Sequence, residues 1–393
     1  MDQTSPKIID HQSSIIDFDP TTRVLFGFGT LEKLGALARE LGCKRALIVS
    51  DAGIVAAGHV KKAEEFLHAA SVTAAVFDGV AENPTTRHVE NGVVFAKDFK
   101  PDVIIGLGGG SSMDCAKGIN FILTNGGKME DYWGVGKATK PMLPSIGIPT
   151  TAGTGSEAQS FALIVQEGTH RKMACGDVKA RFSTVILDPE LVRSAPSDVM
   201  AVTGMDAISH AVESYVSTKR NPISQMFGKE AWRLLAANYP RVLSAPDDTE
   251  ALGKMLLGAH FAGTAIETSM LGAAHACANP LTARFGVTHG IAVGLMLPHV
   301  VRFNGETVNG HYDELLAPLS LVRKPGSNSA TQLAARLVEF MRENNWPFRL
   351  RDLKIGESDL PDLAQEAAQQ WTGKFNPRQV GERELLFLYK RAF

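Results

Sequence analysis

Short apolar segments alternate with segments of helical spacing through the first half of the sequence. The clearest strand candidates are residues 45–50, 72–77 and 102–107, and a helix-patterned segment follows each of them. The last candidate is continuously apolar, which is typical of strands buried on both faces of a parallel sheet. Alternation of this kind predicts an open, mostly parallel α/β sheet of the Rossmann-like type, with helices connecting its strands.

The character of the sequence changes near residue 190. Beyond it Ala, Leu, Gly and Met dominate, strand patterns fade, and helical spacing continues to the C-terminus. A chain of 393 residues is also longer than one ordinary hydrophobic core requires. We therefore predict an α/β domain over residues 1–190 and an all-helical domain over residues 191–393, with surface connections between helices at 240–248 and 324–329.

Composition excludes several classes of function. The chain is 44% hydrophobic and 21% charged with a formal net charge of −2, so no basic excess favours nucleic acid as a partner. Eighteen apolar residues never occur in succession, and the first residues lack an apolar signal-peptide core. The four cysteines are scattered without C-x-x-C spacing, as expected of reduced thiols. We expect a cytoplasmic protein without a membrane partner.

Four side chains in the second half form a candidate metal site. Asp206 and His210 stand four residues apart in a helix-patterned, apolar segment, so both project from one helix face. His275 and His289 follow in segments rich in small and apolar residues. One carboxylate and three imidazoles suit Fe²⁺ or Zn²⁺, with a position left for water or substrate. The alternatives are a capping or surface pair for the first two, and core histidines bonded to backbone carbonyls for the others.

Three loops are candidates for binding a dinucleotide. Glycines 108–110 follow the 102–107 strand directly, where backbone N–H groups and the next helix N-terminus favour a phosphate. The loop 149–157 offers several hydroxyl groups after another apolar strand. Asp51 ends the second strand, where a carboxylate accepts ribose hydroxyls and repels a 2′-phosphate, which favours NAD over NADP. A plain tight turn and an ordinary helix N-cap remain the alternatives for the glycines and Asp51.

Four motifs in one order give the sequence a family resemblance. They are residues 108–117, 148–157, 204–211 and the segment from His275 to His289. With them the chain resembles the iron-containing (group III) alcohol dehydrogenases, which are related to glycerol dehydrogenase and dehydroquinate synthase. The resemblance covers nearly the whole length. It implies an N-terminal nucleotide-binding α/β domain, a C-terminal helical domain, a cleft between them, and a homodimer or larger homo-oligomer.

The resemblance also implies roles for individual residues. Asp206, His210, His275 and His289 match the metal ligands of the family. Asn279 stands where most of the family has a second histidine near the nicotinamide, and an asparagine cannot titrate. The positions that match the family's cofactor-binding loops and their surroundings, in addition to Asp51, are Asn83, Gly109, Gly110, Ser111, Asp114, Thr150, Thr151, Thr154 and Lys172.

The predicted function is NAD(H)-linked oxidation of a small primary alcohol or reduction of its aldehyde. Hydride transfers between substrate and NAD, while Fe²⁺ or Zn²⁺ polarises the substrate oxygen. Three alternatives stay open: a lyase of the dehydroquinate synthase type, which needs a densely basic pocket; a reductase of a specialised polar aldehyde, for which Glu267 and Arg284 are candidate pocket residues; and a structural, non-catalytic metal site.

Overall fold

The computed structural model describes residues 16, 18–169, 171–317 and 328–393, and its first part is built on a parallel sheet. Every pairing in the six-stranded sheet is parallel, which confirms the predicted fold class. In spatial order the strands are β1 (Arg23–Phe26), β9 (Thr184–Leu187), β6 (Ser145–Pro149), β4 (Val103–Gly108), β2 (Arg45–Asp51) and β3 (Thr73–Val80).

Helices cover both faces of this sheet because its strands are apolar on both sides. In β2, Leu47 and Val49 pack with α4 and α5, while Ala46 and Ile48 pack on the opposite face with α1 and α3. Successive side chains of a strand point to opposite faces, so one strand contributes to two cores. The helices of this part are α1 (Leu34–Glu40), α2 (Ala52–Ala56), α3 (His59–Ala69), α4 (Thr86–Phe99) and α5 (Gly110–Asn125).

The strand order fixes where a ligand can bind. The chain passes from β2 outward to β3 and then returns to β4 on the other side of β2. Ligands of open α/β sheets bind beyond the carboxyl ends of the strands at such a switch point. Asp51 ends β2 and Gly108 ends β4, so two of the predicted cofactor loops meet there.

A second, small sheet was not predicted from the sequence. Its order is β5 (Gly134–Val135), β8 (Lys172–Gly176) and β7 (Phe161–Val165), and β7 and β8 pair antiparallel. Short 3-10 helices accompany it. They are η2 (Met129–Tyr132), η3 (Ser156–Ala158) and η4 (Val178–Ala180), and a further one, η1 (Thr30–Lys33), precedes α1.

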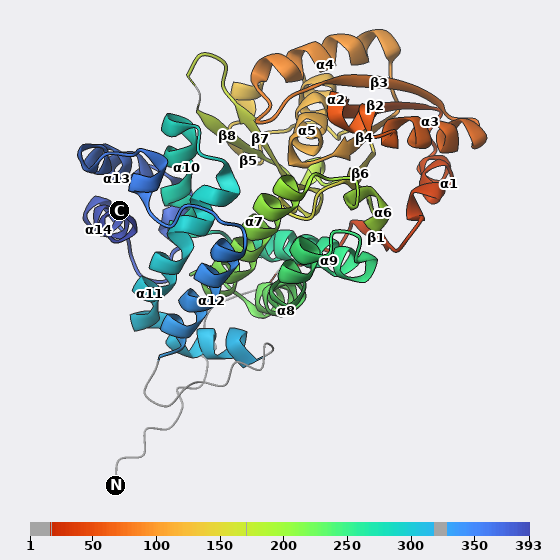
Figure 1. Ribbon diagram of the computed structural model, residues 1–393. Coiled ribbons are helices and arrows are strands. Elements are labelled where there is room, and N and C mark those ends of the chain that lie inside the picture. Colours follow the sequence, from red (N-terminus) through yellow and green to blue (C-terminus); the bar gives the residue numbers. More distant parts are fainter. Residues whose placement is uncertain (1–15, 17, 170, 318–327) are drawn as a thin grey trace.

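Within the described residues, only helices follow β9. Many apolar residues of α7 belong to the largest core, and Figure 1 shows α7 between the sheet and α10–α14. A division into two separately folding domains near residue 190 stays a prediction. The helices are α6 (Pro189–Val192), α7 (Ser197–Val216), α8 (Pro222–Ser244), α9 (Thr249–Thr268), α10 (Ala273–Phe285), α11 (His289–Leu316), α12 (Ser329–Glu343), η6 (Leu350–Leu353), η7 (Glu357–Asp359), α13 (Leu360–Ala368), η8 (Trp371–Phe375) and α14 (Glu382–Ala392).

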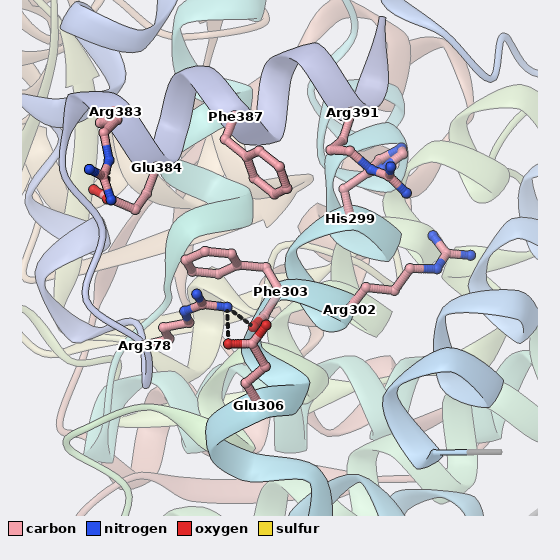
Figure 2. A pocket seen from close by; sticks show the side chains of 9 residues that line it. All are labelled: His299, Arg302, Phe303, Glu306, Arg378, Arg383, Glu384, Phe387 and Arg391. Carbon is pink, nitrogen blue, oxygen red and sulfur yellow. Dashed lines mark hydrogen bonds and ion pairs between the residues drawn. The ribbon is translucent and has the colours of Figure 1, made fainter. Parts of the chain in front are cut away.

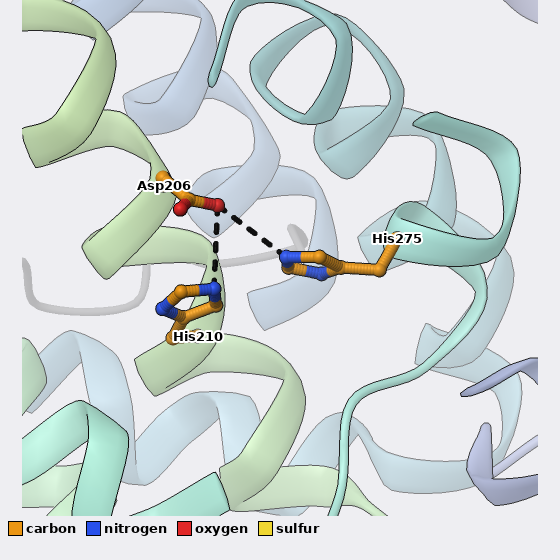
Figure 3. A group of neighbouring side chains, drawn as sticks. All are labelled: Asp206, His210 and His275. Atoms are coloured by element: carbon orange, nitrogen blue, oxygen red, sulfur yellow. Dashed lines mark ion pairs between the residues drawn. The ribbon is translucent and has the colours of Figure 1, made fainter. Parts of the chain in front are cut away.

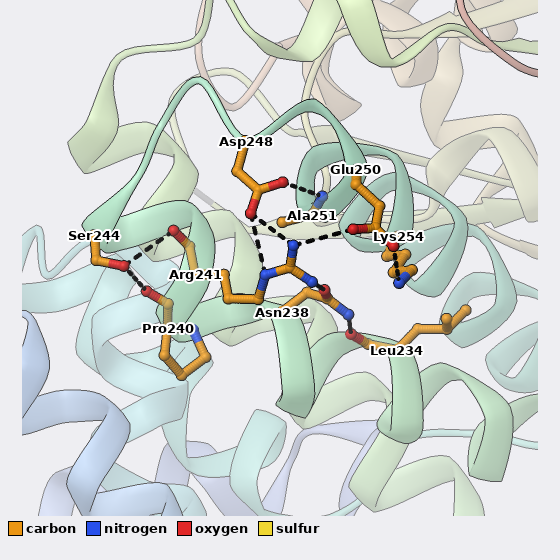
Figure 4. Close-up of polar contacts among 9 residues, drawn as sticks. All are labelled: Leu234, Asn238, Pro240, Arg241, Ser244, Asp248, Glu250, Ala251 and Lys254. Atoms are coloured by element: carbon orange, nitrogen blue, oxygen red, sulfur yellow. Dashed lines mark hydrogen bonds and ion pairs between the residues drawn. The ribbon is translucent and has the colours of Figure 1, made fainter.

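The connection expected at residues 240–248 is shorter than predicted. Helix α8 continues through Pro240 to Ser244, and Arg241 on its last turn bonds Asp248 at 2.7 Å and Glu250 at 3.2 Å (Figure 4). Asp248 also caps α9 by accepting the Ala251 N–H. These ion pairs fasten the end of α8 to the start of α9. The other expected connection, 324–329, lies mostly outside the described residues.

No helix in the described part of the chain is both long enough and apolar enough to cross a lipid bilayer.

Helix α9 touches the backbone of the loop before η3. A Cβ added at Gly263 would lie 2.5 Å from the Gly155 carbonyl oxygen, which is backbone and cannot swing away. We expect Gly263→Ala to destabilise the protein by about 1–3 kcal/mol, because the loop or α9 must shift. The measurement is the thermal unfolding midpoint. Gly310→Ala is the matched control, since nothing lies within 4 Å of its added Cβ; equal midpoints for both variants would contradict the contact.

Candidate metal centre and dinucleotide site

Three helices bring the predicted metal ligands together. Asp206 and His210 lie one turn apart on α7, His275 lies in the first turn of α10, and His289 is the first residue of α11. The Nε2 atoms of His210, His275 and His289 lie 3.3, 3.4 and 3.8 Å from Asp206 Oδ1. Figure 3 shows the first two imidazoles facing that carboxylate.

The donor set fits a divalent cation. Ligand atoms of Asp206, His210 and His275 all lie within 4.8 Å of one another, and the three residues are buried. Asp206 Oδ1 and His275 Nε2 have no hydrogen-bond partner. Burying polar atoms without partners costs free energy, and a cation bound by one carboxylate and several imidazoles would remove that cost. The side chain of His289 is less buried, at 29% exposed, so the cluster is accessible to solvent on the side of His289.

The approach of α11 to α7 depends on a glycine. A Cβ at Gly290 would lie 2.0 Å from the Val202 carbonyl oxygen on α7. Any larger residue there would push the start of α11, and with it His289, away from Asp206.

A second carboxylate, which the sequence analysis missed, orients one of the imidazoles. Glu213 lies on the same face of α7, is 4% exposed, and accepts hydrogen bonds from His275 Nδ1 at 2.5 Å and from the Ala274 N–H at 2.7 Å. With its Nδ1–H engaged by Glu213, His275 directs Nε2 toward Asp206. Carboxylates behind metal-binding histidines commonly fix the ring and its tautomer in this way. The spacing of residues 206, 210 and 213 on one helix face was the available signal.

The charges of this cluster are strongly coupled. Burial raises the pKa of Asp206, but the interactions with His210, His275 and His289 outweigh it and hold that pKa well below its ordinary value. Burial lowers the pKa of His275, but its interactions with Asp206 and Glu213 prevail and raise that pKa to about 9. The cluster thus keeps an ionised carboxylate ready to interact with positive charge.

The glycine cluster after β4 stands at the N-terminus of α5. Gly109 is the N-cap, and no side chain caps the first N–H groups of the helix. A Cβ at Gly110 would lie 2.7 Å from Thr154, so the loop 149–157 packs directly on the glycines, and Thr151 lies next to Gly109. Thr150 Oγ1 is buried without a partner. Free N–H groups and an unpaired hydroxyl meet where a pyrophosphate is expected.

Two roles were predicted for Asp51, contact with the cofactor ribose and capping of a helix N-terminus. One carboxylate oxygen accepts the N–H groups of Gly53 and Ile54 and so caps α2. The other accepts the Ser112 hydroxyl at 3.1 Å, which joins β2 to α5. The N-cap is therefore present, and contact with a ribose stays a prediction. Ser111 lies in the first turn of α5, beside the predicted phosphate position.

Asp114 supports the loop from beneath. Its carboxylate accepts the Ser156 hydroxyl at 2.5 Å and lies 3.7 Å from the ammonium of Lys117. The buried Lys117 also donates to the carbonyls of Ser156 and Phe161, both at 2.7 Å. Burial lowers the pKa of Lys117 against the opposing attraction of Asp114. With its carboxylate engaged by this network, Asp114 holds the loop 149–157 in position.

Lys172 and Asn83 face each other. Lys172 Nζ lies 3.4 Å from Asn83 Oδ1, and Asn83 holds a left-handed backbone (φ 52°) at the turn after β3. The ammonium of Lys172 adds to the lowering of the His289 pKa that burial causes, and it partly offsets the raising of the Asp114 pKa by burial. Lys172 therefore lies within electrostatic reach of both the Asp206 cluster and helix α5.

Asn279 and the two candidate pocket residues, Glu267 and Arg284, each have polar partners. Asn279 lies one turn after His275 on α10 and donates to Gln370 at 3.0 Å. Glu267 pairs with Arg181 at 2.9 Å and accepts the Ser160 N–H. Arg284 pairs with carboxylates on α13 at 3.4 Å. Glu267 and Arg284 thus belong to separate ion pairs, and the Glu267 side chain is 9% exposed while that of Arg284 is 33% exposed. Their role as substrate-pocket residues stays a prediction.

The contact between Glu213 and His275 yields a direct prediction. Glu213→Gln removes the negative charge behind the imidazole, so we expect metal affinity to fall about 10–100-fold. Competition with a chromophoric chelator measures that affinity for Fe²⁺ and Zn²⁺. Glu314→Gln is the control, because Glu314 bonds the Tyr215 hydroxyl away from the cluster. Unchanged metal affinity in Glu213→Gln would refute the orienting role.

Comparison with known proteins agrees with this geometry. Residues 20–189 match the family model for iron-containing alcohol dehydrogenase, and residues 200–393 match the C-terminal model of the Fe-containing alcohol dehydrogenase family. Alcohol dehydrogenase 4 of Schizosaccharomyces pombe is 36% identical, over 94% of this chain and 87% of its own length.

Two solved structures share the whole fold. The crystal structure of a 1,3-propanediol oxidoreductase has a TM-score of 0.92 and 31% identity, and the alignment covers 97% of this chain and 100% of that one. A sulfoacetaldehyde reductase from Bifidobacterium kashiwanohense, in complex with NAD⁺, has a TM-score of 0.87 and 26% identity, covering 97% and 99%. The chain belongs to the iron-containing alcohol dehydrogenase family.

Proposed function

We propose that Asp206, His210, His275 and His289 hold one Fe²⁺ or Zn²⁺ ion, and that the adjoining cleft binds NAD(H). The observation that carries the proposal is the convergence of three Nε2 atoms on one buried carboxylate oxygen that has no hydrogen-bond partner. Family membership makes the chain a metal-dependent, NAD-linked oxidoreductase of alcohols and aldehydes. The residue assignments and the choice of metal are the proposed part.

The chain's own residues position and polarise the reactants. A metal ion at this site supplies Lewis acidity to the substrate oxygen, and bound NAD accepts or returns the hydride. Glu213 holds His275 in the required tautomer. The N–H groups at the start of α5, with Thr150, Thr151 and Thr154, bind the pyrophosphate. Asn279 hydrogen-bonds near the nicotinamide and cannot take up a proton, so the substrate proton leaves by another route.

The substrate we propose is a small primary alcohol or its aldehyde. A dehydroquinate synthase-type lyase would need a strongly basic pocket, whereas Arg181 and Arg284 are engaged in ion pairs. A specialised polar aldehyde remains the second candidate, and the 26% identical sulfoacetaldehyde reductase is a family precedent for it. Asn279, Gln370 and Lys172 are the polar groups available on that side.

The assembly and location are also proposals. Val24 and Phe26 of the edge strand β1, and Phe28 after it, are 41–53% exposed. An exposed apolar strand at a sheet edge supports pairing with a second copy, and so a homodimer or larger homo-oligomer. Four buried, free cysteines are in keeping with a reducing cytoplasm.

Turnover tests the proposed metal ligands. Protein loaded with Fe²⁺ or Zn²⁺ under reducing conditions should oxidise NADH with short aldehydes, and the absorbance of NADH reports the rate. Asp206→Ala/His275→Ala should lose this activity and the bound metal while still binding NADH. Arg284→Ala is the control, since Arg284 is partly exposed and pairs with α13. Aldehyde turnover by the metal-free double variant would overturn the proposal.

Cofactor preference tests Asp51 separately. Serine is also a good N-cap, so Asp51→Ser keeps the cap of α2 while removing the charge that repels a 2′-phosphate. We expect kcat/KM for NADPH relative to NADH to rise about tenfold, equivalent to ~1.4 kcal/mol. An unchanged ratio would show that Asp51 serves α2 alone.

A further inference from the structure

A positively charged groove lies on the helical part, away from the metal cluster. It has a volume of about 450 Å³ and lies between α11 and α14 (Figure 2). That volume falls in the usual range for small-molecule sites. Arg302 in its wall follows His289 by thirteen residues on α11, which is about 20 Å along a helix. The groove is therefore separate from the site described above.

Two of its arginines are paired with carboxylates. Arg378 pairs with Glu306 at 2.9 Å and lies over the Phe303 ring, and Arg383 pairs with Glu384 at 3.2 Å. These pairs make one end of the groove close to neutral.

The other end carries uncompensated positive charge. Arg302 and Arg391 have no carboxylate within 4.0 Å among the described residues, and Arg302 donates only to the Pro298 carbonyl there. Burial lowers the pKa of Arg302, and Arg391 lowers it further. Burial, Arg302 and Arg391 together lower the pKa of His299, which lies with them, to about 4. Two guanidinium groups that repel each other beside a neutral imidazole form a place where an anion would be stabilised.

An apolar surface borders this charge. Phe387 of α14 is 53% exposed, and Figure 2 shows its ring between the neutral end and Arg391. A flat ring of a ligand can stack on the exposed phenyl ring of Phe387. A charged substituent on the same ligand can then contact the neighbouring guanidinium groups.

We propose that this groove binds a small molecule with a dianionic head, bound by Arg302 and Arg391, and a flat apolar body that packs on Phe387. Guanidinium groups bind phosphate and carboxylate oxygens through paired hydrogen bonds, and one dianion balances the two charges. The neutral imidazole of His299 contributes a ring N–H that donates a hydrogen bond to the anionic head. The ligand could carry a phosphate monoester or two neighbouring carboxylates, and both share this chemistry.

Binding of model ligands to the whole protein tests the proposal. Phenyl phosphate and phthalate are the probes, with inorganic phosphate as the head alone and phenol as the body alone. Saturating NADH is present throughout, so that the pyrophosphate loop is blocked. Calorimetry should show phenyl phosphate or phthalate binding at least tenfold more tightly than either fragment. Whichever probe binds better identifies the head.

Variants tie that binding to the groove. Arg302→Gln/Arg391→Gln should weaken it at least tenfold, while Arg383→Gln, whose charge is already paired, should leave it unchanged. NADH affinity and aldehyde turnover confirm that each variant is folded. Equal affinity in the double variant, no binding by any probe, or binding that NADH abolishes would overturn the proposal. So would a change in oligomer size on substitution without a change in probe affinity, which would mark the groove as a contact between copies.

Discussion

The arrangement of this protein depends on the placement of one buried carboxylate opposite three imidazoles. Asp206 is 7% exposed, yet it remains ionised because histidines from three helices face its Oδ1. Such a cluster is unstable in an apolar core unless its charges and lone pairs are balanced. Glu213 balances one side of it, and the proposed metal balances the rest. The helices α7, α10 and α11 must therefore meet at close range.

Small residues make that close approach possible. Gly290 lets the start of α11 touch the backbone of α7, and Gly155 and Gly263 let the cofactor loop touch α9. The buried Lys117 of α5 donates hydrogen bonds to Ser156 of this loop and to Phe161 of β7, so it connects the loop to both elements. The loop that we propose contacts the cofactor is thus held from both the sheet and the helical part.

Features carried by local sequence patterns could be predicted. Apolar runs such as residues 102–107 indicated the buried strands of the main sheet. The four-residue spacing of Asp206 and His210 indicated that they share one helix face. The small and apolar residues around His275 and His289 then indicated the other two ligands. What could not be predicted depends on contacts between distant segments. Glu213 meets His275 across 62 residues, and Asp114 meets Ser156 across 42. The strands β7 and β8 are short and the sequence between them is largely polar, so no alternating apolar pattern predicted this hairpin.

The most direct test of the proposed metal centre is an anomalous difference map, recorded at the iron edge from crystals of Fe²⁺-loaded, NADH-bound protein. The account predicts one strong peak about 2.0–2.2 Å from Asp206 Oδ1 and from the Nε2 atoms of His210, His275 and His289. A peak elsewhere, or iron that binds with full occupancy and leaves these four side chains uncoordinated, would contradict it.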